Sequence, residues 1–344
     1  MDDSVFKISD QIKTVNEGYR HVVILGAGAS KASCIDNPEK NGKQLPLMND
    51  LPKIINLDKE LLDLSPDLKN ENFEKIFSTL FELEPNSDRL KSIEKKIYAF
   101  FESLELSPNP TIYDYLILSL RKKDLIATFN WDPFLWQAFR RNLKLTDNLP
   151  QIVFLHGNVA IGICEDSNTF GPNGYKSLKS GKPFIPTKLL YPVANKNYNS
   201  DNYIKNQWSA LSHFLKKSPA RVTIFGYSAP ISDVEAITIM KEAWGNPEKD
   251  KQFTRLELID IQSESTLSKS WKNFIFSHHY EITNDFFKSS IVRFPRRTGE
   301  VFFANYLESK WYEENYPPRF KNHKEMWNWY RPFIEAEKNI CQHT

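Results

Sequence analysis

Five short apolar runs, each followed directly by a polar or glycine-bearing turn, constrain this 344-residue chain more than any other feature of its sequence. Helical patterns separate most of the runs. Near-continuous apolar strands that alternate with helices are typical of a parallel sheet covered by helices on both faces. We therefore predict an α/β chain with a Rossmann-like parallel sheet. Its expected strands are residues 21–25, 125–129, 151–155, 221–225 and 256–260.

The first run leads into the turn Gly26-Ala-Gly-Ala-Ser30. Glycine lets a backbone approach a ligand closely because it has no Cβ. A helix N-terminus adds free N–H groups and a positive dipole end, which suit a pyrophosphate. Ser30 can cap such a helix or donate to a phosphate. The common dinucleotide fingerprint is incomplete, since Lys31 stands at its third glycine position, so a turn without a ligand is the alternative.

Two further strand ends carry side chains suited to chemistry. Asn130 and Asp132 follow the second run, and His156 follows the third. A carboxamide can donate and accept hydrogen bonds, which suits a ribose hydroxyl or an attacking water. Histidine can act as a general base near neutral pH. The alternatives are structural, because Asn and Asp are common in turns and a histidine at a strand end often makes a structural hydrogen bond.

A helical insertion is predicted over about residues 55–122. Asn72 is the expected N-cap of one helix, and further helices are expected over about 88–105 and 110–122. Residues 31–52 read as a long loop near the presumed ligand. Apolar positions spaced by three and four residues place one face of the first helix in the core. They are Phe73, Ile76, Phe77, Leu80 and Phe81.

Composition excludes several classes of protein. The formal net charge of +2 provides no general basic field for nucleic acid. Cys34, Cys164 and Cys341 form no C-x-x-C pair, so neither a metal site nor a disulfide framework is expected. No apolar run approaches the roughly 20 residues that span a bilayer, and the first residues lack a basic leader. We therefore expect a cytoplasmic protein without membrane segments.

In their order, the motifs resemble those of the sirtuin-like family. Those proteins carry Gly-Ala-Gly-x-Ser, an Asn-x-Asp strand end, His-Gly and a late Gly-x-Ser turn. The resemblance covers about residues 20–265 and implies a Rossmann-like fold that binds NAD at the strand ends. The matching segments of this chain are Gly26-Ala-Gly-Ala-Ser30, Asn130-Trp-Asp132, His156-Gly157 and Gly226-Tyr-Ser228.

The resemblance also implies a role for each matching residue. One group is placed at the nicotinamide ribose, with the histidine as base or ribose ligand, and comprises Asn130, Asp132 and His156. A second group holds the pyrophosphate and comprises Gly26, Ala27, Gly28 and Ser30. A third group lines the adenine-ribose and phosphate side and comprises Gly226 and Ser228.

Two departures from protein-deacylating sirtuins point to a different reaction. The zinc-binding C-x-x-C pairs are missing, and Lys31–Asp50 lacks the Gly-Ile-Pro-Asp-Phe-Arg stretch. The Asn-Trp-Asp form, the helical insertion and the Gly-Tyr-Ser-x-Pro turn are most similar to the bacterial branch that hydrolyses NAD in anti-phage defence. The resemblance thus implies an NAD glycohydrolase that takes NAD as substrate, uses no metal and releases nicotinamide and ADP-ribose.

Such an activity would harm its own cell if it were always on, so we expect gating by an effector, an activating partner protein or assembly into a homo-oligomer. Two other classes stay open. One is a regulatory module that binds NAD or ADP-ribose without turnover. The other is an ADP-ribosyltransferase or deacylase.

The chain is expected to divide into an NAD-binding domain over residues 1–265 and a helical, aromatic-rich extension over 266–344. Trp and Tyr are common at binding hot spots, and exposed apolar patches often mark interfaces. The extension is therefore predicted to meet another subunit or a partner protein. The alternative is that its aromatic rings pack onto the helices of the sheet.

Overall fold

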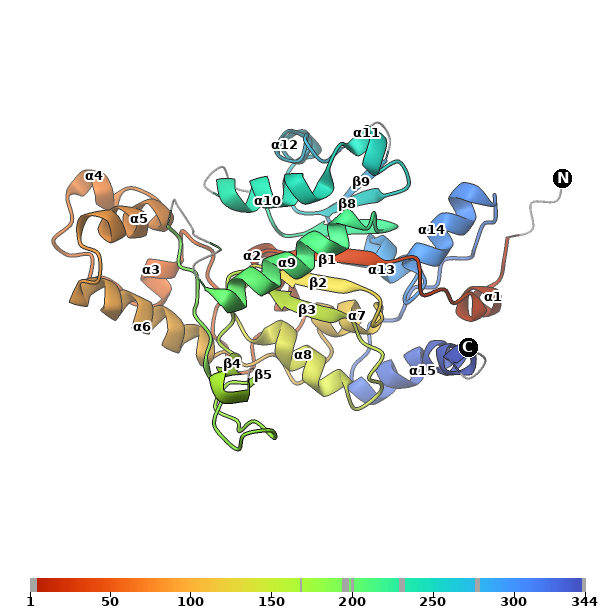
Figure 1. Cartoon of the computed structure of the whole chain (residues 1–344), viewed down its shortest axis with the longest axis horizontal. Helices are drawn as coiled ribbons and strands as arrows, with labels where there is room; N and C mark the ends of the chain where they lie inside the picture. The colour runs from red at the N-terminus through yellow and green to blue at the C-terminus, as the bar shows by residue number, and fades with distance from the viewer. Residues whose placement is uncertain are drawn as a thin grey trace.

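Figure 1 shows a computed structural model of the chain, which describes residues 5–167, 169–193, 198, 201–228, 233–275 and 279–341, the side chains of 339–341 excepted. Within these residues, six strands form one sheet in the order β3-β2-β1-β7-β8-β9, and all neighbours are parallel. The strands are β1 (His21–Leu25), β2 (Leu125–Thr128), β3 (Gln151–Phe154), β7 (Arg221–Phe225), β8 (Arg255–Ile259) and β9 (Tyr280–Thr283).

The order of the strands reverses at the centre of the sheet. From β1 the chain moves outward to β2 and β3, and it later returns to the other side of β1 with β7 before moving outward to β8 and β9. Ligands of open parallel sheets bind beyond the carboxyl ends of the strands at such a reversal. The predicted Rossmann-like parallel sheet is confirmed, and the turns after β1 and β7 flank this position.

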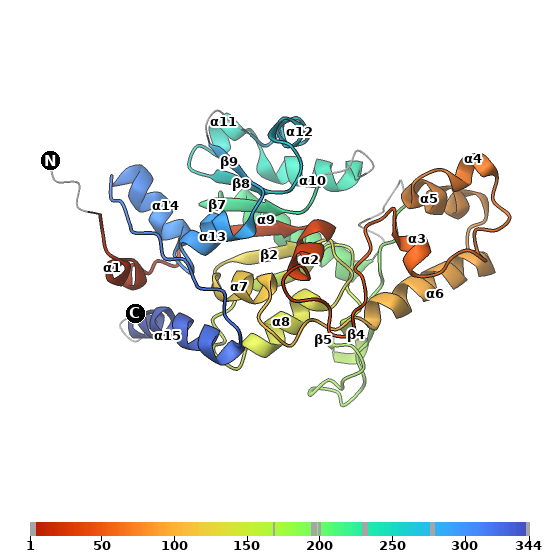
Figure 2. The same ribbon diagram turned by 180° about the vertical axis from the view of Figure 1, so that it is seen from behind.

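Helices cover both faces of the sheet, as predicted. Alternate side chains of β1 pack on opposite faces of the sheet. Val22 and Ile24 belong to one apolar core, and Val23 and Leu25 belong to the other. Figures 1 and 2 show the two helical layers from opposite sides. The first core is covered by α9 (Asn202–Lys216), α10 (Val234–Trp244) and α12 (Glu264–Ser270), and the second by α2 (Ala27–Ser33), α7 (Ile112–Leu118), α8 (Phe134–Asn142) and α13 (Ser290–Arg293).

Most of the predicted helical insertion forms a lobe at one end of the molecule (Figure 1), whereas its last helix, α7, packs against the sheet. The side chain of Asn72 accepts a hydrogen bond from the amide of Lys75 at 2.9 Å, which confirms the predicted N-cap. Four of the five predicted core positions are buried, but Phe81 is 46% exposed, so its assignment to the core was wrong. The lobe contains α3 (Leu51–Ile54), α4 (Pro66–Lys69), α5 (Phe73–Leu83) and α6 (Asp88–Glu102).

Two groups of strands differ from the prediction. β9 lies in the extension, which was expected to hold only helices and loops. It is an edge strand whose residues are partly exposed. Because the strand includes polar residues such as Glu281, its sequence has no continuous apolar run. Between His156 and Arg221, where an irregular segment was expected, a small antiparallel sheet has the order β5-β4-β6. Its strands are β4 (Ile161–Cys164), β5 (Thr169–Pro172) and β6 (Ile185–Pro186). The domain boundary after residue 265 stays a prediction.

Most aromatic side chains of the C-terminal extension pack within the chain. Trp271, Phe286 and Phe302 are buried, as is Tyr330, whereas Trp311 is 54% exposed. Packing therefore accounts for most of these rings, and contact of the extension with a partner stays a prediction. The remaining helices are α1 (Ile8–Lys13), α11 (Pro247–Asp250), α14 (Thr298–Leu307) and α15 (His323–Cys341), with short 3-10 turns at Glu165–Ser167 and Phe286–Lys288.

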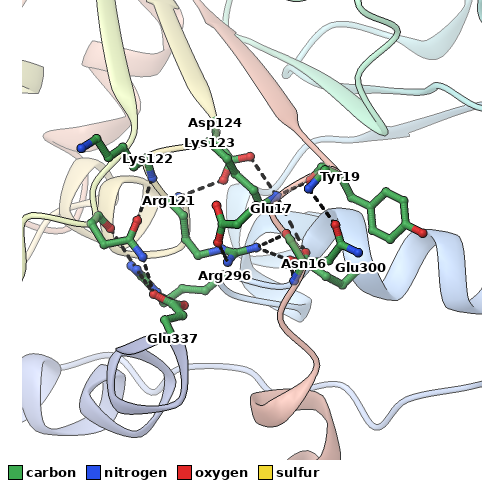
Figure 3. Close-up of polar contacts among 12 residues, drawn as sticks. Asn16, Glu17, Tyr19, Arg121, Lys122, Lys123, Asp124, Arg296, Glu300 and Glu337 are labelled. Carbon is green, nitrogen blue, oxygen red and sulfur yellow. Dashed lines mark hydrogen bonds and ion pairs between the residues drawn. The ribbon is translucent and has the colours of Figure 1, made fainter. Parts of the chain in front are cut away.

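A buried network of charges fixes α14 and α15 to the body of the protein (Figure 3). Arg296 and Arg297 both donate to the carboxylate of Glu337 on α15, at distances of 2.6 to 2.8 Å. Arg121, just before β2, pairs with Glu300 on α14. All of these side chains are buried. Charges removed from water are tolerated only when they are paired and hydrogen-bonded, so each partner is needed by the others.

Candidate functional site

A cavity of about 600 Å³ lies at the carboxyl edge of the sheet, where the turns after β1 and β7 meet. This volume is within the usual range for small-molecule sites. The structure brings residues from four strand ends together there, and their roles stay predictions. All nine predicted site residues line the cavity: Gly26, Ala27, Gly28, Ser30, Asn130, Asp132, His156, Gly226 and Ser228.

The two glycine turns pack directly against each other. A Cβ added at Gly26 would lie 2.4 Å from the carbonyl oxygen of Gly226, and one added at Gly28 would lie 2.8 Å from the Cα of Gly226. Gly226 itself has a φ of +61°, which favours glycine, and a Cβ there would lie 2.3 Å from the nitrogen of Ala29. Close contact between two backbones therefore accounts for the absence of Cβ at all three positions.

The start of α2 differs in two ways from the prediction. The N-cap is Gly26, and Ser30 lies inside the helix, so Ser30 does not cap it. The amide of Gly28 already donates to the carbonyl of Gly226, and the amide of Ala29 to that of Gly26, both at 3.0 Å. The expectation of a fully free set of amides is thus wrong, because the neighbouring turn occupies part of it.

We expect Gly28→Val to lower thermal stability. The added side chain would press on the backbone of Gly226, and overpacking of this kind costs about 1–3 kcal/mol or more. Thermal unfolding measures the effect. Gly18→Ala is the control, since its Cβ would meet only the side chain of Asn16 at 3.1 Å. A Gly28→Val protein with the stability of the wild type would contradict the close packing of the two turns.

A connected polar network lies in the wall of the cavity. The hydroxyl of Ser30 donates to Asp132 at 2.7 Å, and the amide nitrogen of Asn130 donates to Ser30 and to the carbonyl of Gly26, each at 2.8 Å. The hydroxyl of Tyr113, on α7, lies 2.6 Å from that of Ser30. All four side chains are buried. Such a network holds its members in fixed orientations.

Tyr113 is a member of this network that the sequence did not indicate. It belongs to the segment Ile-Tyr-Asp-Tyr-Leu-Ile-Leu, whose pattern is that of a core helix. The ring does lie in the core, and only the hydroxyl reaches the site. Burial raises the pKa of Tyr113 well above its ordinary value, so the phenol stays neutral and can donate or accept.

Burial raises the pKa of Asp132 to about 6, although hydrogen bonds from Ser30 and from the amide of Phe134 oppose the change. The ionised form of this carboxyl is therefore less favourable in the folded protein than in the unfolded chain. Groups that titrate near neutral pH inside a cavity are common at functional sites.

We expect Asp132→Asn to make the protein more stable than the wild type at about pH 7.5. The folded-state pKa of about 6 exceeds the unfolded value of 3.8, so the stabilising contribution of Asp132 is complete below the unfolded value and is lost as the pH rises through 6. The loss is on the order of 2–3 kcal/mol. Denaturant unfolding between pH 4 and pH 8 measures it, with Asp147→Asn at an exposed position as control. If the free energy of unfolding changed with pH in the same way for the wild type and Asp132→Asn, the raised pKa of Asp132 would be contradicted.

His156 is held between aromatic rings in the wall of the cavity. Its Nε2 lies 2.9 Å from the hydroxyl of Tyr198, a second residue that the sequence analysis missed. The edge of Phe129 packs on its ring with 4.8 Å between centroids, and Phe129 in turn stacks on Tyr227. The hydrogen bond to Tyr198 is compatible with both earlier readings of His156, a structural partner and a base whose ring is fixed in place.

The charges around the cavity are one-sided. Its described lining contains four carboxyl groups and neither Lys nor Arg. A site of this composition favours positive charge and offers a phosphate backbone, hydroxyl and side-chain amide donors in place of a Lys or Arg side chain. The loop around residues 45–51 and the rings of Phe101 and Trp131 supply the apolar wall. The carboxyl groups are Glu74, Asp132, Asp233 and Asp260.

No group of three or more His, Cys, Asp or Glu side chains in the part of the chain that the structure describes could hold a metal ion. No helix in the same part is both long and apolar enough to cross a membrane.

Neither a protein-family model nor a curated protein matches the sequence. Solved structures of Sir2 homologues align with the chain at low identity. One in complex with ADP-ribose is 12% identical with a TM-score of 0.37, and covers 96% of this chain and 97% of that one. Another, in complex with NAD, is 14% identical with a TM-score of 0.38, and covers 86% and 90%. A Sir2 structure with an inhibitor, 2′-O-acetyl-ADP-ribose and a deacetylated peptide is 13% identical with a TM-score of 0.35, and covers 73% and 91%. Scores in this range do not assign the chain to a family.

Proposed function

We propose that the cavity binds NAD and hydrolyses the bond between its nicotinamide and its ribose. One observation carries the proposal: the four sequence motifs that resemble the sirtuin-like family lie far apart in the chain, and all of them line this one cavity at the reversal of strand order. By this proposal the chain belongs to the zinc-less, NAD-hydrolysing branch of that family, and its products are nicotinamide and ADP-ribose.

The proposed reaction breaks the bond between C1′ of the ribose and the nitrogen of nicotinamide, and the electron pair leaves with nicotinamide. Positive charge then grows on the ribose, and the carboxyl groups of the lining favour it. Water adds to C1′ and loses a proton. We assign acceptance of that proton, or of a ribose hydroxyl proton, to His156. Asn130 orients the water, and its hydrogen bonds to Gly26 and Ser30 fix the amide that does so.

NAD turnover by the purified chain tests the proposal. Chromatography of the reaction should show nicotinamide and ADP-ribose in equal amounts, and calorimetric titration should show that NAD binds. Binding without turnover, in every assembly state, would instead favour a regulatory module. A mass increase on an acceptor protein would favour an ADP-ribosyltransferase, and loss of an acyl group from a peptide would favour a deacylase. Failure to bind NAD would overturn the assignment of the cavity.

We further propose that the activity is gated and serves anti-phage defence by depleting NAD. This step rests on the resemblance of the motifs and on the cost of an ungated activity to its own cell. Cellular NAD measured during phage infection tests it, with a His156→Ala strain as control. NAD that stays constant in infected cells carrying the wild-type protein would overturn the defensive role.

A further inference from the structure

A basic hairpin projects from the small antiparallel sheet, and the proposed reaction does not use it. We define the basic hairpin as residues 170–188, which contain four lysines and no acidic residue. Lys182 pairs with Asp166, which lies just before the basic hairpin in the 3-10 turn Glu165–Ser167. Lys176 and Lys179 are exposed, and neither forms an ion pair within the described residues.

The tip of the basic hairpin is ordered by its own hydrogen bonds. The amide of Ser177 donates to the carbonyl of Lys182, and the amide of Gly181 donates to that of Ser177, both at 2.8 Å. Leu178, at the tip, is fully exposed. Phe170, Tyr175 and Ile185 on the same element are also about half exposed. An ordered tip that holds a leucine and aromatic rings in water has the character of a binding surface.

An acidic corner lies on the helical insertion. We define the acidic corner as residues 58–84, which contain eight acidic residues and three lysines. Leu62 and Leu83 are exposed there. They share one corner of the lobe, because Arg89 lies 3.9 Å from Asp63 and 3.5 Å from Glu84, which are their immediate neighbours in the chain. The acidic corner therefore combines exposed apolar side chains with negative charge.

We propose that two copies of this chain form a dimer in which the basic hairpin of each copy binds the acidic corner of the other. The two surfaces match in charge, and both offer an apolar centre with a charged rim, as protein interfaces do. In both views the small sheet and α4–α5 project from the body at separate places, with α6 between them (Figures 1 and 2). A two-fold axis would form both contacts at once.

A second copy is the occupant that the structure favours, because the chain carries both complementary surfaces itself. The acidic corner also adjoins the cavity, since Asn72 and Glu74 at the start of α5 line it. Docking of the basic hairpin at this position would therefore place a neighbouring copy beside the mouth of the site. The dimer does not depend on the proposed reaction.

A charge exchange between the two surfaces tests the dimer. The first variant is Lys176→Glu with Lys179→Glu, and the second is Asp67→Lys with Glu71→Lys. Analytical ultracentrifugation of the full chain across a concentration series should show a dimer for the wild type. Each variant alone should dimerise at least about tenfold more weakly, because like charges then face each other. An equimolar mixture should recover the dimer, since both contacts become complementary again.

Lys321→Glu with Lys324→Glu serves as the control, because these exposed lysines lie near the start of α15, away from both surfaces. Its dimer should match that of the wild type. Circular dichroism verifies that each variant is folded. A wild type that stays monomeric at every concentration overturns the proposal, as do variants that dimerise normally or a mixture that fails to recover the dimer. Leu178→Asp should weaken dimerisation without any change at the acidic corner.

Discussion

His156→Ala is expected to reduce NAD hydrolysis about a hundredfold or more, together with some loss of thermal stability. The loss of turnover follows from removal of the group that accepts a proton, a role that contributes about 10²–10⁴-fold in enzymes. Stability falls because the buried ring packs on Phe129 and its Nε2 lies within hydrogen-bond distance of the Tyr198 hydroxyl. Steady-state kinetics of nicotinamide release measure kcat and KM separately.

Two variants sharpen this test. Asn130→Ala should also cost about a hundredfold in turnover and should lower stability as well, because the hydrogen bonds to Gly26 and Ser30 are lost. His213→Ala, at an exposed position on α9, should leave turnover unchanged. Wild-type rates in both the His156 and the Asn130 variants would show that the reaction occurs elsewhere or by other residues.

Glu337→Ala is expected to destabilise the protein by about 3–5 kcal/mol, the usual result of removing one partner of a buried ion pair. The change would leave Arg296, drawn beside Glu337 in Figure 3, buried without its carboxylate partner. Arg297 would lose the same partner. Glu335→Ala should have little effect, because Glu335 lies on the opposite, exposed side of the same helix. Denaturant unfolding of both variants measures the difference. Equal stabilities would mean that the network does not hold α15 in place.

The same carboxylate predicts sensitivity to acid. Burial alone would raise the pKa of Glu337, but the guanidinium groups of Arg296 and Arg297 outweigh burial and hold it at about 2, below the unfolded value of 4.5. The contribution of Glu337 to the free energy of unfolding is therefore complete above the unfolded value and is lost as the pH falls towards 2.

Deletion of residues 300–344 would remove Glu337 together with Glu300 and is expected to unfold the chain. Point variants at exposed positions are therefore the better test of a partner surface in the extension.

The sequence predicted those parts of the fold that depend on local patterns. The central strands are continuous apolar runs because both faces of the sheet are covered, and Asn72 caps its helix through a bond to an amide three residues on. The edge strand β9 and the small sheet have no such run. Gly162, Gly171 and Pro172 interrupt the small sheet, and these residues weaken any strand signal.

At the candidate site, the sequence indicated residues that line one cavity but not the contacts that hold them there. Gly26 and Gly226 are distant in the chain, so no local pattern shows that their turns pack on each other. Tyr113 has the spacing of a core residue and is one, yet its hydroxyl reaches Ser30. The pKa of Asp132 depends on its burial, which exists only once α2, α7 and the strand ends are assembled.

The contact between the two glycine turns has a consequence for how the protein is made. β7 inserts beside β1, so the cavity requires two turns that are synthesised far apart in time, at Gly26 and at Gly226. Domains fold as their chain leaves the ribosome, from the N-terminus onward, and contacts distant in sequence form late. A nascent chain that has emerged only as far as β3 therefore has no partner for its first turn. A product whose translation stops before β7 would lack the second glycine turn of the proposed site and would therefore be inert towards NAD.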